Sequence, residues 1–131
     1  LKKHEYLVDL NFDILIFLLG ILEINTKVIK ASDYSFSGEK SDLVLDMCVQ
    51  LDSDIYIFGE QGRNYADEES FLQKKITPYF QKYNHPSYKQ IRGDFEPFMS
   101  ILDLIFNMGP KSKEVLMSGN ISRKDILNMS K

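Results

Sequence analysis

Histidine is the residue type best suited to acid–base chemistry at neutral pH, and this chain has two, His4 and His85. His85 lies beside Pro86 in a segment rich in aromatic residues. Its imidazole could take a proton from an attacking amine or hydroxyl group. An ordered loop can equally hold a histidine through a backbone hydrogen bond, so both roles stay open for His85.

A second candidate site is the polar loop from Gly59 to Asp67, between a predicted strand and a predicted helix. Its backbone amides and a guanidinium group could bind the phosphate of an activated sugar or an acyl-adenylate. The residues expected to contact substrate here are Gly59, Gly62, Arg63 and Tyr65. The loop matches no phosphate-binding signature, and the acidic residues 67–69 would repel an anion. A plain turn with a solvated arginine is therefore the alternative.

A carboxylate and an amide lie one helical turn apart in a later predicted helix, at Asp103 and Asn107. Together they could orient the acceptor of a transfer reaction, with Asp103 as a catalytic group. However, Ser100 and Asp103 also have the spacing of a capping box, which would give Asp103 a structural role. The spacing favours the cap, and the role in substrate binding remains the alternative.

Aromatic side chains are dense between residues 79 and 98, where they could pack against the apolar faces of sugar rings. The polar neighbours Gln90 and Arg92 could then bind sugar hydroxyl groups. The aromatic residues are Tyr79, Phe80, Tyr83, Tyr88, Phe95 and Phe98. At least half of them are equally well explained as a loop that seals the edge of the core.

The composition excludes several classes of protein. The only cysteine, Cys48, cannot form an intrachain disulfide, and we expect it to be a buried thiol in a reducing cytosol. Without clustered histidines or cysteines a zinc site has no support, and the carboxylates of residues 67–69 suit a helix dipole better than Mg²⁺. A net charge of −3 argues against nucleic acid as a partner. The apolar stretch Ile14 to Leu22 is too short to span a membrane.

The elements that position these residues alternate between helices and strands, which predicts an α/β fold with a short, largely parallel sheet. We expect this sheet to belong to a larger Rossmann-like α/β domain. The expected helices cover 7–22, 41–51, 67–74, 100–109 and 110–116, and the expected strands cover 26–31, 54–58 and 76–82. Ser41 is the expected cap of the second helix, and Ser122 with Asp125 has the capping-box spacing of a last helix.

Three blocks of sequence resemble the C-terminal half of the WbqC-like family. They begin at Gly38-Glu39-Lys40-Ser41-Asp42, at Asp54-Ile55-Tyr56-Ile57-Phe58-Gly59 and at His85-Pro86-Ser87-Tyr88-Lys89-Gln90, and the third ends at Gly109-Pro110. The order and spacing of the blocks, rather than any one of them, carry the resemblance. We therefore expect residues 1–131 to be a single domain, the C-terminal part of a longer protein, with residues 120–131 as a tail that frays.

The resemblance implies an acyl or aminoacyl transferase, of a glycine-transferring type, that modifies an amino sugar of bacterial surface polysaccharide such as O-antigen. Its partners would be an activated sugar or an acyl donor in the bacterial cytoplasm. Two alternatives stay open: a non-catalytic module that binds a sugar or nucleotide-sugar, and a fragment that functions only with a missing N-terminal part. The sequence names no cofactor and leaves a homo-oligomer open.

Overall fold

The computed structural model describes residues 3–129 of the chain. These residues form two compact units. The helical unit contains residues 3–28 and 85–119, and the sheet unit contains residues 29–84 and 120–129.

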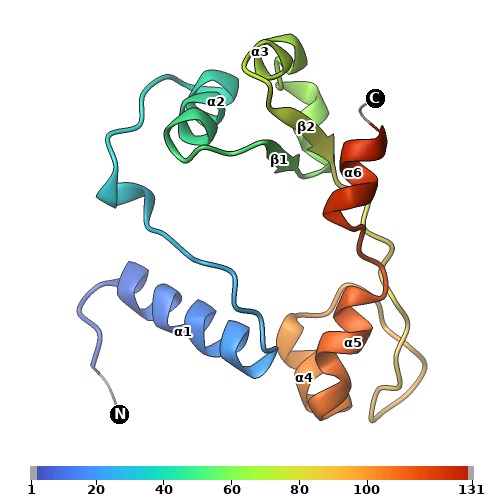
Figure 1. Cartoon of the computed structure of the whole chain (residues 1–131). Helices are drawn as coiled ribbons and strands as arrows, with labels where there is room; N and C mark the ends of the chain where they lie inside the picture. The colour runs from blue at the N-terminus through green and yellow to red at the C-terminus, as the bar shows by residue number, and fades with distance from the viewer. Residues whose placement is uncertain (1–2, 130–131) are drawn as a thin grey trace. The chain divides into compact units, whose positions relative to one another are not determined.

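The sheet unit is built on two parallel strands, β1 (Ile55–Phe58) and β2 (Thr77–Phe80), in register from Ile55 opposite Thr77 to Phe58 opposite Phe80. Between the strands run the 3-10 helix η2 (Glu60–Asn64) and the helix α3 (Glu68–Gln73). The 3-10 helix η1 (Ala31–Asp33) and the helix α2 (Lys40–Gln50) precede β1 (Figure 1). The expected short, parallel sheet with flanking helices is therefore confirmed.

The core of the sheet unit lies between α2, α3 and the two strands. Its buried residues are Cys48, Phe58, Phe71, Ile76 and Phe80. The ring of Phe58 stacks on that of Phe80 at 5.1 Å between centroids and meets the ring of Phe71 edge-on at 5.4 Å. Burial raises the pKa of the Cys48 thiol, which confirms the expected packed cysteine and disfavours the thiolate that a nucleophile needs.

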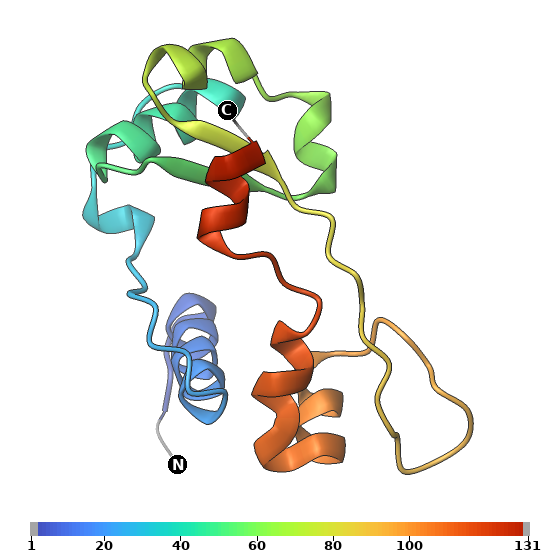
Figure 2. The same ribbon diagram turned by 45° about the vertical axis from the view of Figure 1, so that its right-hand side comes forward.

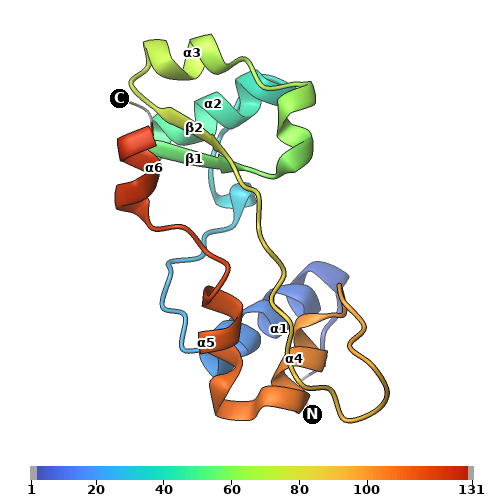
Figure 3. The same cartoon turned by 90° about the vertical axis from the view of Figure 1, so that its right-hand side faces the viewer.

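The last helix, α6 (Arg123–Met129), lies next to the strands in all three views (Figures 1, 2 and 3). Arg123 forms an ion pair with Asp54, the residue just before β1. Ser122 Oγ accepts from the Asp125 backbone N–H at 3.2 Å and donates to the Asp125 carboxylate at 2.6 Å. The capping pair expected from the spacing is thus present, and it starts a helix that returns to the sheet.

The helical unit contains α1 (Leu7–Ile21), α4 (Ile101–Met108), the 3-10 helix η3 (Gly109–Lys111) and α5 (Ser112–Met117). Pro110 stands in the first turn of η3, as expected, and the buried Ser112 hydroxyl donates to the Gly109 carbonyl at 2.7 Å. No residue of α1 is buried. Within residues 3–129, no helix combines the length and the apolar character needed to cross a membrane.

Two local predictions are wrong. Residues 26–30 adopt no regular structure, and Ala31 begins η1, because the β-branched residues of this segment have no strand beside them to complete a ladder. Ser41 does not cap α2, whose cap residue is Glu39. Instead the buried Ser41 hydroxyl accepts a hydrogen bond from the backbone N–H of Asp67 at 2.9 Å, and so joins α2 to the start of α3.

Gly62 offers a direct test of packing in the sheet unit. A Cβ atom at this buried position would lie 2.6 Å from the Cβ of Phe58, a residue of the buried core. We expect Gly62→Ala to lower the free energy of unfolding by about 1–3 kcal/mol, since the core has no room to adjust. Urea denaturation followed by circular dichroism measures the loss.

Gly59 is the matched control, because a Cβ atom there meets nothing within 4 Å. Gly59→Ala should change the free energy of unfolding by no more than about 0.5 kcal/mol. Equal stability of the two variants would contradict the close packing of Gly62 against Phe58.

Candidate functional site

Ser100 is the N-cap residue of α4, but its side chain makes no capping hydrogen bond. Only the backbone is used: the Asp103 N–H donates to the Ser100 carbonyl at 3.0 Å. The expected capping box is therefore absent, and the structural explanation that it offered for Asp103 is wrong. The physical reason is competition, since other donors occupy the Asp103 carboxylate.

The Asp103 carboxylate receives three hydrogen bonds from side chains. Tyr88 Oη donates to Oδ2 at 2.7 Å, and Gln90 Nε2 donates to the same oxygen at 2.9 Å. Asn107 Nδ2 donates to Oδ1 at 3.0 Å. The Tyr88 hydroxyl, followed by the Gln90 amide, lowers the pKa of Asp103, so the carboxylate stays charged at neutral pH.

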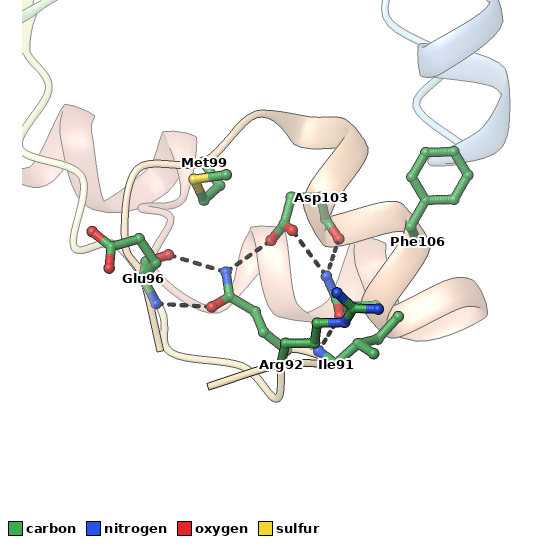
Figure 4. A pocket seen from close by; sticks show the side chains of 8 residues that line it. Ile91, Arg92, Glu96, Met99, Asp103 and Phe106 are labelled. Atoms are coloured by element: carbon green, nitrogen blue, oxygen red, sulfur yellow. Dashed lines mark hydrogen bonds between the residues drawn. The ribbon is translucent and has the colours of Figure 1, made fainter. Parts of the chain in front are cut away.

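The loop before α4 is held to the helix by the same amide side chains. The Gln90 side-chain amide pairs with the backbone of Glu96 through two hydrogen bonds, as a residue of a neighbouring strand would. Its Nε2 donates to the Glu96 carbonyl at 3.0 Å, and its Oε1 accepts from the Glu96 N–H at 2.8 Å. Asn107 Oδ1 accepts from the Ile91 N–H at 2.8 Å (Figure 4). Asn107 also donates to the Asp103 carbonyl at 2.8 Å. Gln90 and Asn107 therefore use all their N–H donors within the loop and helix.

A pocket of about 520 Å³ opens where the loop meets α4. Its lining residues are Gln90, Ile91, Arg92, Glu96, Met99, Asp103, Phe106 and Asn107. Apolar side chains form an open rim, since Ile91 is 80% exposed and Phe106 77% exposed. Figure 4 shows the Asp103 carboxylate with Met99 and Phe106 on either side of it. The pocket thus combines a charged centre with apolar walls.

His85 lies near this network but does not line the pocket. Its ring packs against Phe98 at 5.2 Å and stacks on Tyr88 at 6.4 Å between centroids. Its Nδ1 is 2.9 Å from the Pro86 carbonyl oxygen, which is the backbone hydrogen bond of a histidine in an ordered loop. With Nδ1–H as the donor, the basic lone pair of the neutral ring is on Nε2. A role as general base stays a prediction.

Five of the expected site residues belong to the sheet unit: Gly59, Gly62, Arg63, Tyr65 and Tyr83. The Arg63 guanidinium lies over the Phe80 ring, 4.3 Å from its centroid, and Tyr65 meets Phe58 edge-on at 6.0 Å. Burial raises the pKa of Tyr83. Arg63, Gly62 and Tyr65 therefore each have a packing role, and their binding of substrate stays a prediction.

The acidic residues 67–69 also have a structural role. Asp67 caps α3, with its carboxylate accepting from the Ser70 N–H at 3.3 Å and the Ser70 hydroxyl at 2.6 Å. The hydrogen bond from the Ser70 hydroxyl lowers the pKa of Asp67. In the part of the chain that the structure describes, no three His, Cys, Asp or Glu residues gather closely enough to hold a metal ion.

Four of the residues that line the pocket were not among the sequence candidates: Ile91, Glu96, Met99 and Phe106. For the three in the loop, the only sequence signal is that apolar residues are interspersed with charged ones through residues 91–99, which is unusual for a solvated loop. Phe106 had no such signal. The link from Tyr88 to Asp103 had no signal at all, because it joins residues 15 positions apart through an irregular loop.

Comparison with known proteins gives two matches. The model of the WbqC-like protein family matches residues 1–115. The match reaches the first residue, so the resemblance is not limited to the C-terminal blocks that begin at residue 38. The chain is also 33% identical over 116 residues to the uncharacterized protein Rv1507c of Mycobacterium tuberculosis, covering 88% of this chain and 50% of the relative. The chain thus spans about half the length of the curated relative that it matches. No solved structure matches the chain.

The lowered pKa of Asp103 predicts how its contribution to stability depends on pH. A depressed pKa in the folded state stabilises the fold above the ordinary carboxyl range, and this stabilisation is lost as pH falls through the lowered pKa. Asp103→Asn should therefore be less stable than the unmodified chain at neutral pH. The difference should shrink as pH falls below the ordinary carboxyl range and through the lowered pKa of Asp103, because the carboxyl group then becomes as uncharged as the amide.

Urea denaturation at a series of pH values measures this difference. Asp94→Asn is the control, since Asp94 is an exposed residue of the same loop, and it should change stability little at any pH. A deficit for Asp103→Asn that stayed constant from neutral to acidic pH would show that charge is not the cause.

Proposed function

Because this chain belongs to the WbqC-like protein family, we propose that it is part of a bacterial transferase that moves an acyl or aminoacyl group onto an amino sugar. The group would be of the glycine type, and the product would enter cytoplasmic synthesis of a surface polysaccharide such as O-antigen. The family resemblance suggests the pathway. The observation that best supports an amino sugar as the substrate is the charged Asp103 carboxylate, which lines a pocket with apolar walls.

The pocket suits one sugar ring in size and character. Its volume of about 520 Å³ lies within the range of small-molecule sites. The exposed ring of Phe106 offers a flat apolar surface to the C–H face of a pyranose. Arg92 supplies N–H donors for hydroxyl groups. Gln90 and Asn107 act differently from the sequence expectation: with their donors already used, they position Asp103 and the loop.

Asp103 is suited to hold an ammonium group rather than to accept its proton. Oδ2 already accepts two hydrogen bonds, whereas Oδ1 accepts one and keeps room for a charge-assisted bond. A carboxylate with a lowered pKa is a weak base. Asp103 would therefore bind and orient the amino group of the acceptor.

In the transfer step, the ammonium group held by Asp103 would first give one proton to a base, and the neutral amine nitrogen would then attack the acyl carbon of an activated donor. The C–N bond forms, the bond from the acyl carbon to the leaving group breaks, and the second proton lost by the nitrogen leaves with the departing group, as a thiol if the donor is a thioester. His85 is the proposed base for the first proton, because histidine is the side chain that most often serves as a general base in proteins. Its ring stacks on that of Tyr88, and the Tyr88 hydroxyl group donates to Asp103, so Tyr88 links the proposed base to the carboxylate.

A second candidate function is a module that binds an amino sugar without catalysis. It is favoured by the lining of the pocket, whose eight residues include no histidine, cysteine, serine or lysine. In this case the charge of Asp103 and the apolar rim of the pocket would serve only to recognise the sugar.

Binding of glucosamine compared with glucose tests the role of Asp103. The unmodified chain should prefer glucosamine, and Asp103→Asn should remove that preference, lowering glucosamine affinity by about tenfold, the value of a good charge-assisted hydrogen bond. Phe106→Ala should weaken both sugars. Leu102→Ala, an exposed residue of the same helix outside the pocket lining, should weaken neither. Isothermal titration calorimetry measures the affinities, and a preference that survives Asp103→Asn would refute the site.

Turnover distinguishes the two candidate functions. If the chain is a transferase, it should form N-glycyl glucosamine from glucosamine and a glycyl thioester, detected by mass spectrometry. His85→Ala should then abolish product formation while glucosamine still binds, because His85 would accept the proton and is not among the residues that would hold the sugar. Full turnover by His85→Ala would refute the proposed base. Binding without product in the unmodified chain would favour the recognition module.

A further inference from the structure

A second pocket, of about 440 Å³, adjoins the first in the helical unit. It is lined by Lys89, Gln90, Ile91, Asn107, Met108 and Lys111. Three of these residues, Gln90, Ile91 and Asn107, also line the first pocket. The two pockets therefore share a boundary formed by these three residues, and the hydrogen bond from the Ile91 N–H to Asn107 Oδ1 holds two of them together.

The two pockets differ in charge. Asp103 and Glu96 outnumber Arg92 in the first pocket, so its net charge is negative. The ionisable residues of the second pocket are Lys89 and Lys111, and no acidic residue lines it. Within residues 3–129 neither lysine forms an ion pair with a carboxylate. A ligand that occupies both pockets would thus meet negative charge in the first and positive charge in the second.

The position of the lysines is only partly explained by the fold. Lys111 follows the C-terminal end of α4, where a positive charge stabilises the exposed carbonyl groups. Lys89 comes from the irregular loop and has no such role. The hydrogen bonds of the loop bring it to the same hollow as Lys111.

We propose that the second pocket binds the phosphate of a phosphorylated amino sugar whose amino group lies at Asp103. This inference rests on the proposed function and narrows its acceptor to a sugar phosphate ester. Lysine binds phosphate as a point charge without the fixed geometry of arginine, and two exposed lysines suit a group that must leave after transfer. The phosphate could belong to a nucleotide-linked or to a lipid-linked sugar, since both share the sugar 1-phosphate.

Glucosamine 1-phosphate, glucosamine and inorganic phosphate test the proposal by calorimetry on the full chain. Glucosamine 1-phosphate should bind about tenfold more tightly than glucosamine, as expected for two exposed charge pairs, and added salt should weaken it more. The double variant Lys89→Gln with Lys111→Gln should lower its affinity to that of glucosamine. The same variant should bind glucosamine unchanged, which also shows that it folds.

Lys113→Gln is the matched control, because Lys113 is a lysine of the same unit that pairs with Glu23 and lines neither pocket. Equal loss of affinity in this control, or no gain from the phosphate in the unmodified chain, would overturn the inference. If glucosamine still bound through Asp103 in that case, the proposed function would stand.

A different set of results would separate the phosphate site from the amino-sugar function. If glucosamine does not bind, but inorganic phosphate binds and is lost in the double lysine variant, the amino-sugar function fails while the phosphate site remains. Tighter binding of uridine-diphosphate glucosamine or of a short-chain polyprenyl-diphosphate glucosamine would support the proposal and identify the source of the phosphate.

Discussion

The hydrogen bonds of one carboxylate, that of Asp103, hold the candidate site together. The loop from His85 to Ser100 has no helix or strand of its own, and ordering such a segment costs on the order of 1 kcal/mol per residue in conformational entropy. Tyr88, Gln90 and Asn107 converge on Asp103 and offset part of this cost. The two pockets beside the loop exist because the loop is held against α4 in this way.

The same hydrogen-bond network separates the polar residues that shape the loop from those that remain to bind a ligand. The side-chain amide donors of Gln90 and Asn107 are used in shaping the loop, so the proposed recognition of the substrate is assigned to the charged groups Arg92, Glu96 and Asp103. Asp103 serves both purposes, since three donors fix its position and also keep it ionised. A group that is held rigidly and stays charged is a good binding group and a weak base. That is why the proposed function separates binding at Asp103 from proton transfer at His85.

In the sheet unit, packing explains residues that the sequence suggested as substrate-binding residues. Arg63 lies over the ring of Phe80, and glycine is the only residue type that fits at position 62, against Phe58. The aromatic contacts around Phe58 join both strands to α3. The loop expected to bind an anion is therefore part of the wall of a small core, which gives Arg63 a role that does not depend on a ligand.

Local chemistry in the sequence determined much of this protein. The apolar spacing of α2, the β-branched and aromatic run of β1, the Gly109-Pro110 end of α4 and the Ser122–Asp125 cap each depend on residues a few positions apart, and the parallel pairing of the strands follows from their order. The tertiary structure decided the rest. Ser41 and Asp103 both have the spacing of helix caps, yet their partners are the backbone of Asp67, 26 positions away, and the side chain of Tyr88, 15 positions away. A cap competes with every other donor or acceptor that folding brings close, and those competitors are set by packing rather than by neighbours in the chain.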